Sequence, residues 1–151
     1  MMERRQLYRQ VLTVVVTLAA CGLGPATAAE PDELTRVREL RLEGSLDKAQ
    51  ALAEETLDST PLDSDLRIDL HLELARIHDR RGLHRNTRPV AAALQEIETA
   101  AAVTSTPSPS ARAKIELARA ECHYRAETPS REFARATVHA DRAAELFREI
   151  G

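Results

Sequence analysis

Apolar residues recur along this chain at the three- and four-residue spacing of an α-helix, in segments separated by glycine, proline or serine. The pattern is clearest near the end of the chain. One helical face there carries Phe133, Ala136, Ala140, Ala143, Phe147 and Ile150. No segment of useful length alternates apolar and polar residues with the period of two that marks a β-strand. The pattern therefore predicts an all-α protein with six helices.

The ends of the first three expected helices follow from residues that start or stop a helix. Pro31 precedes the first, and Gly44 stands where a residue with a left-handed backbone would end it. The second covers approximately residues 46–58. The third begins near Ser64 or Asp65, and Gly82 follows its end.

The last three expected helices are separated by proline-containing segments. The fourth follows Pro89 and extends to about residue 101. Residues 104–110 (TSTPSPS) lack periodicity and contain two prolines, so they form an exposed loop, with Ser110 as the N-cap of the fifth helix. The sixth follows residues 128–130 (TPS).

Part of the sequence is repeated. Residues 72–76 (LELAR) return as residues 115–119 (IELAR), 43 positions later. A fainter copy lies 38 positions upstream, where Arg38 corresponds to Arg76 and Gly44 to Gly82. Repeats at a period of roughly 20–50 residues are typical of solenoids, in which each unit buries its apolar face against its neighbours. We therefore expect three stacked helical hairpins.

Small residues occupy the second helix of each expected pair, and here the chain resembles the tetratricopeptide repeat family. That motif has a large and then a small residue on its first helix, glycine at the turn, spaced alanines on its second helix and a final proline. The matching residues are Gly44, Ala49, Ala53, Leu57 and Pro61 in the first repeat, Leu74, Ala75, Gly82 and Ala91 in the second, and Leu117, Ala118, Ala136, Ala140 and Ala143 in the third. The family's tryptophan is absent, and Leu40, His78 and Glu121 replace its tyrosine.

The resemblance implies that residues 31–151 form one domain that binds a protein or peptide in a concave groove lined by the first helices. Arg38, Arg76 and Arg119 share one repeat position and would line that groove, with Arg41 and Arg112 nearby. Guanidinium groups suit acidic side chains or a C-terminal carboxylate, so the expected partner is acidic. The alternative is that these arginines are solvated or pair with neighbouring acids, namely Glu39, Glu73 and Glu116.

The first residues have the character of an export signal. Three arginines precede an apolar run at residues 11–20, which is too short to span a membrane. Residues 26–28 (ATA) fit secretory cleavage, which makes residues 1–28 a signal peptide. Residues 18–21 (LAAC) resemble a bacterial lipobox, which would make residues 1–20 the signal and Cys21 a lipidated N-terminus. Both alternatives predict export, to the periplasm or to a lipid-anchored position on the bacterial envelope.

Composition and missing motifs restrict the function further. The formal charge is −3 and aromatic residues make up 3% of the chain, which disfavours nucleic-acid binding. Zinc-protease, paired-cysteine, nucleophile-elbow and phosphate-loop motifs are absent, so we expect no catalysis, metal or cofactor.

We therefore expect a scaffold or adaptor that binds other proteins, and the alternative is the truncated periplasmic sensor region of a larger signalling receptor. Apolar Phe147 and Ile150 near the C-terminus suggest self-association through the last helix.

Overall fold

The computed structural model describes residues 32–59, 61–85, 90–125 and 131–151, and these residues form six α-helices. The helices are α2 (Asp32–Leu42), α3 (Leu46–Ser59), α4 (Ser64–Arg85), α5 (Val90–Ala102), α6 (Pro109–Arg125) and α7 (Arg131–Ile150). Helix accounts for 87% of this described part, which contains no strand. The all-α prediction is confirmed.

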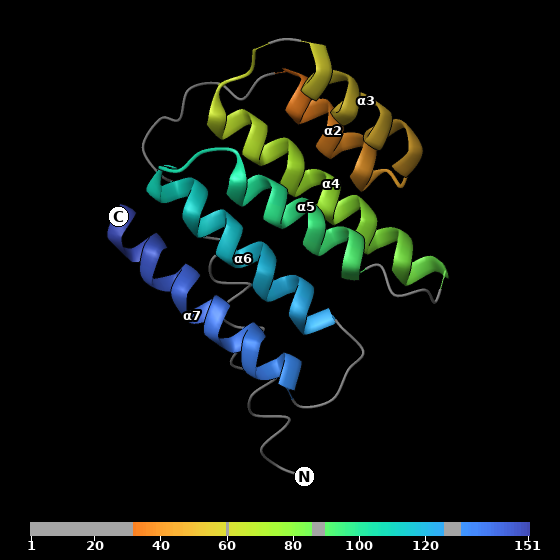
Figure 1. The fold of residues 1–151 in the computed structure, drawn as a ribbon. Coiled ribbons are helices and arrows are strands. Elements are labelled where there is room, and N and C mark those ends of the chain that lie inside the picture. Colours follow the sequence, from red (N-terminus) through yellow and green to blue (C-terminus); the bar gives the residue numbers. More distant parts are fainter. Residues whose placement is uncertain (1–31, 60, 86–89, 126–130) are drawn as a thin grey trace.

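The helices form three hairpins that stack in chain order (Figure 1). Each hairpin pairs two consecutive helices: α2 with α3, α4 with α5, and α6 with α7. The first helices of neighbouring hairpins also touch, so α4 contacts both α2 and α6. The first helices α2, α4 and α6 therefore lie side by side.

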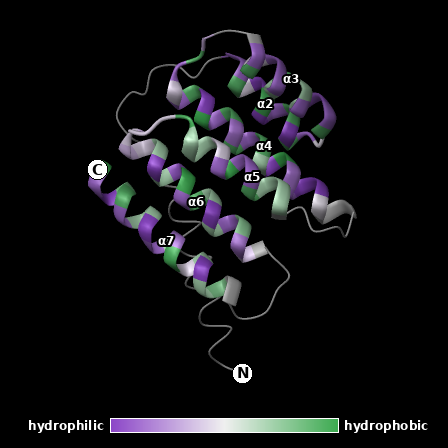
Figure 2. Ribbon diagram, viewed as in Figure 1, coloured by the Kyte–Doolittle hydropathy of each residue, from purple (hydrophilic) through white to green (hydrophobic). Residues whose placement is uncertain are grey.

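Two apolar clusters hold the stack together, and α4 contributes to both. Toward the first hairpin, α4 presents Leu70, Leu74 and Ile77 to buried residues of α2 and α3. On its other side, α4 presents Ile68, Leu72 and Ala75 to α5 of its own hairpin and to α6 of the last hairpin. Hydrophobic and hydrophilic positions accordingly alternate around the helices (Figure 2).

Buried alanines lie on both helices of the last hairpin. The buried alanines here are Ala113 and Ala120 on α6 and Ala136, Ala140 and Ala143 on α7. Small side chains let two helix axes approach closely. The expectation of packed alanines is met here and at Ala49 and Ala53, but Ala91 is exposed. On α5 the buried alanines are Ala93 and Ala100 instead.

Gly44 ends α2 as expected. Its φ is +85°, and its N–H donates to the carbonyl oxygen of Arg41 at 3.2 Å. The N–H of Ser45 donates to the carbonyl oxygen of Leu40 at 2.9 Å. This pair of hydrogen bonds is the Schellman motif, which requires a left-handed residue and therefore favours glycine.

Two expected helix ends need correction, whereas α4 begins at Ser64 as expected. The helix α4 continues through Gly82, which is buried, to Arg85. Its N-cap is Asp63, whose Oδ1 accepts hydrogen bonds from the N–H groups of Asp65 and Leu66. The N-cap of α6 is Ser108 rather than Ser110, because the Ser108 Oγ accepts a hydrogen bond from the N–H of Ala111 at 3.0 Å.

The second and third hairpins are related by 41 positions, not by the 43 of the repeated sequence. On α4 the residues that face the preceding hairpin are Leu70, Leu74 and Ile77. On α6 the corresponding residues are Ala111, Ile115 and Ala118, each 41 positions later. Ile115 therefore packs in the same cluster as Leu72 instead of occupying its equivalent place. A shift of two residues turns a side chain by about 200° around a helix axis.

Candidate functional site

The most concentrated group of charges in the described residues is an arginine cluster around Glu73, which comprises Arg38, Arg41, Glu73 and Arg76. Glu73 is fully buried on α4. Its Oε1 accepts hydrogen bonds from Nε of Arg38 at 3.2 Å and from Nη1 of Arg76 at 2.5 Å. Its Oε2 accepts one from Nε of Arg41 at 2.7 Å. One carboxylate therefore accepts hydrogen bonds from three guanidinium groups.

The electrostatics of Glu73 follow from this geometry. Burial opposes its ionisation, but the positive charges of Arg76, Arg41 and Arg38 outweigh burial, so the pKa of Glu73 lies below its ordinary value. The arginine side chains keep 27%, 18% and 30% of their surface exposed for Arg38, Arg41 and Arg76 respectively. The cluster thus has a buried negative centre and a partly exposed positive rim.

Helical spacing explains how the side chains meet. Arg38 and Arg41 are three residues apart on α2, and Glu73 and Arg76 are three apart on α4, so each pair shares one face of its helix. One turn beyond Arg76, the Arg80 Nη1 donates to the carbonyl oxygen of Arg41 at 3.1 Å. The contact between α2 and α4 brings these faces together.

The five arginines predicted for the groove do not form one row. Arg38, Arg41 and Arg76 meet at Glu73, whereas Arg119 donates to both carboxylate oxygens of Glu98 on α5 at 3.0 Å. Its Nη1 also donates to Oε1 of Glu116 at 2.9 Å. Burial opposes the charge of Arg119, but Glu98 and Glu116 outweigh burial and raise the pKa of Arg119. Arg112 is exposed in the first turn of α6.

The register explains this placement. Because 41 positions relate the last two hairpins, Leu117, and not Arg119, is equivalent to Arg76. The alternative, that these arginines pair with neighbouring acids, holds for Arg76 with Glu73 and for Arg119 with Glu116. Glu39 pairs with Arg36 instead.

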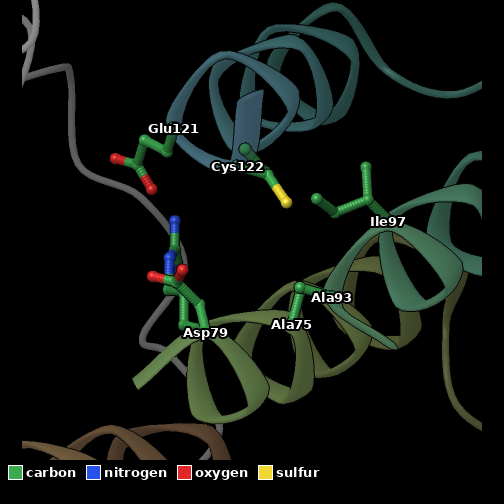
Figure 3. A pocket seen from close by; sticks show the side chains of 8 residues that line it. Ala75, Asp79, Ala93, Ile97, Glu121 and Cys122 are labelled. Atoms are coloured by element: carbon green, nitrogen blue, oxygen red, sulfur yellow. The ribbon is translucent and has the colours of Figure 1, made fainter. Parts of the chain in front are cut away.

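A small cavity of about 20 Å³ adjoins the cluster between α4, α5 and α6. Its apolar lining is Ala75, Ala93, Ile97, Ala118 and Cys122, and its polar lining is Arg76, Asp79 and Glu121. The Cys122 sulfur points toward Ile97, while the Glu121 carboxylate points toward the side of Asp79 (Figure 3). This cavity could not be predicted from sequence patterns, because its walls come from three helices.

Glu121 is unlike the other acids of this region. Burial raises the pKa of its carboxyl group and Glu73 adds to the rise, while the charges of Arg76 and Arg41 act against it without prevailing. Among the described residues, Glu121 has neither a hydrogen bond nor an ion pair within 4.0 Å. Its charge is therefore poorly compensated.

The histidines of the described residues pair with acids or stack on each other instead of converging on a metal site. The His71 Nδ1 lies 2.9 Å from Oε2 of Glu96, and the His139 Nδ1 lies 2.6 Å from Oε2 of Glu116. The rings of His123 and His139 stack with centroids 5.5 Å apart. In the part of the chain that is described, no three metal-binding side chains converge, and no helix is long and apolar enough to cross a bilayer.

Two further predictions concern the two ends of the chain. The export signal and Cys21 lie outside the described residues. The helix α7 exposes Phe133, Val138 and Ile150 by 45%, 64% and 46%, so apolar surface is present there, and self-association through it stays a prediction.

Comparison of the chain with protein-family models, curated proteins and solved structures finds no match. The arginine cluster must therefore be interpreted from its own geometry.

Proposed function

We propose that this chain is an exported, non-catalytic interaction scaffold of tetratricopeptide-like construction, and that the arginine cluster around Glu73 binds an acidic group of a protein or peptide partner. The observation that supports this function most directly is the excess of guanidinium over carboxylate at one place on the face shared by α2 and α4.

The hydrogen-bond count favours a role in binding. A guanidinium group has five N–H donors, and Glu73 receives one hydrogen bond from each of three arginines. Arg41 and Arg76 each retain donors that make no hydrogen bond to the described residues. A partner carboxylate could therefore bind in bidentate fashion without displacing Glu73.

Local charge favours an acidic partner. The protein is acidic overall, with a formal charge of −3, yet the cluster combines three positive groups with one negative group. Opposite charge at an interface raises the association rate and suppresses wrong partners, and both effects weaken with added salt.

Fluorescence polarisation with a labelled hexaglutamate peptide tests this function. We expect saturable, salt-sensitive binding that the Arg41→Gln variant weakens by about tenfold, the effect of one charged hydrogen bond. The matched controls Arg112→Gln and Arg119→Gln remove arginines outside the cluster and should bind as the parent does. Glu73→Gln should bind at least as tightly as the parent, because it removes the competing negative charge.

Two results would reject the role of the cluster: equal loss of binding in Arg41→Gln and in both controls, or no saturable binding at low salt. Export is tested separately, by determining the N-terminus of the mature protein after expression in a bacterium. Cleavage after Ala28 supports a secretory signal, and a lipid-modified Cys21 supports the lipobox.

A further inference from the structure

We propose that the cavity between α4, α5 and α6 is a binding site for a free α-amino acid with a one-carbon side chain, for which alanine is the probe. Arg76 holds the carboxylate of the ligand, Glu121 holds its ammonium group, and its methyl group enters the cavity. This site adjoins the acidic-partner surface and shares Arg76 with it.

The size and the lining of the cavity suit a methyl group. The cavity measures about 20 Å³, which is room for one water-sized group and not for a branched side chain. Its floor is apolar, with Ala75, Ala93 and Ala118 around it. A methyl group fits such a space and excludes water from carbon surface, whereas a leucine side chain is too large for it.

The charged groups at the cavity are one guanidinium, that of Arg76, and two carboxylates, those of Glu121 and Asp79. Arg76 and Glu121 both line it, yet they form no ion pair within 4.0 Å in the described part of the chain. The single hydrogen bond of Arg76 to a described residue goes to Glu73, which leaves further N–H groups of the guanidinium able to bind. An α-amino acid carries its carboxylate and ammonium on one carbon, and so can bridge two opposite charges a few ångströms apart.

The charge of Glu121 is poorly compensated when no ligand is bound. Burial raises the pKa of this carboxyl group, and the charges of Arg76 and Arg41 are not sufficient to cancel the rise. An ammonium group would supply the missing compensation, and bound ligand should therefore favour ionised Glu121. The Glu121 carboxylate and the Cys122 sulfur point to different sides (Figure 3), so the polar and apolar parts of the site are separate.

Isothermal titration calorimetry with the purified full chain tests the ligand class. We expect saturable, one-to-one binding of L-alanine. Propionate lacks the ammonium group and L-alaninamide lacks the carboxylate, so each should bind about 10- to 100-fold more weakly, the effect of losing one charged hydrogen bond. L-Leucine should show no binding at the concentration that saturates with alanine.

Two variants test the residues. Glu121→Gln preserves shape but removes the partner of the ammonium group, so alanine should bind it at least about tenfold more weakly. Ala93→Val fills the cavity and should weaken alanine more than it weakens glycine, which lacks the methyl group. The matched controls are Glu98→Gln, whose carboxylate pairs with Arg119, and Ala92→Val, at an exposed position of α5. Both controls should bind alanine as the parent does.

Three outcomes would overturn the proposal. Absence of saturable alanine binding would show that the cavity holds only water. Equal affinity for propionate and alanine would reduce the site to an anion site at Arg76. Unchanged alanine binding in Glu121→Gln, with the fold verified by its melting curve, would remove the ammonium contact. None of these outcomes depends on whether hexaglutamate binds to the cluster.

Discussion

Replacing Glu73 by Gln removes the negative centre of the arginine cluster while preserving the size of the side chain. Three guanidinium groups would then face one another around a neutral amide. Removing one partner of a buried ion pair costs about 3–5 kcal/mol when the remaining charge stays buried. The arginine side chains here are 18–30% exposed, so water recovers part of that loss. We expect a decrease of about 2–4 kcal/mol in the free energy of unfolding.

The chain contains a matched control for this change. Glu116 lies in nearly the same local sequence as Glu73, is also buried, and pairs with the arginine three residues later. It holds one arginine instead of three, and its other partner is His139. Glu116→Gln should therefore cost about 1–2 kcal/mol, because a single charge is left without its partner.

Thermal unfolding followed by circular dichroism measures the difference. For a domain of this size, 1 kcal/mol corresponds to roughly 3–5 °C, so Glu73→Gln should lower the Tm by about 10 °C and Glu116→Gln by about 5 °C. Adding Arg41→Gln to Glu73→Gln should recover at least about 1 kcal/mol, because it relieves the repulsion. Equal losses for the two single variants, or no recovery in the double variant, would refute the shared role of Glu73.

Three further predictions concern the helix ends and the acids. Gly44→Ala should lower stability by about 1 kcal/mol through its φ of +85° alone, since nothing lies within 4 Å of an added Cβ; Glu43→Ala is the control in chemical denaturation. Ser108→Ala should cost about 1 kcal/mol and Ser110→Ala much less, and the reverse order would restore Ser110 as the N-cap. Because the pKa of Glu121 is raised above 4.5, its ionisation destabilises the fold as the pH rises through that raised pKa. Glu121→Gln should therefore have a higher Tm than the parent at pH 7 and the same Tm below about pH 4.5. The pKa of Glu73 is lowered, so ionised Glu73 stabilises the fold above about pH 4.5 and this contribution is lost as the pH falls through the lowered pKa.

Local signals in the sequence were sufficient for the helices and for some of their ends. Apolar spacing identified all six described helices, and Gly44 marked a true left-handed cap. Gly82 was misleading because glycine inside a helix costs only about 1 kcal/mol, which packing can offset at this buried position. Ser108 is followed directly by Pro109 at the first helical position, a signal that favours Ser108 as the N-cap and that the prediction of Ser110 did not use.

The register of the repeat could not be read from sequence similarity. Because α4 is apolar on two opposite sides, residues 72–76 match residues 115–119 in letters while facing the other way. Only the contacts between hairpins distinguish the two sides. The same limit applies to the cluster, since Arg38 and Arg41 reach Glu73 across more than 30 residues of chain.

Polar contacts support the 41-residue register independently of the apolar clusters. In that register Glu73 on α4 is equivalent to Lys114 on α6. Glu73 pairs with arginines of the preceding first helix, α2, and Lys114 pairs with Asp69 of its own preceding first helix, α4, at 2.7 Å. Both interfaces between first helices therefore contain an ion pair, with the charges exchanged between the two helices. If the third hairpin stacked directly on the first in this register, Lys114 would lie beside Arg38 and Arg41, and this repulsion disfavours that order.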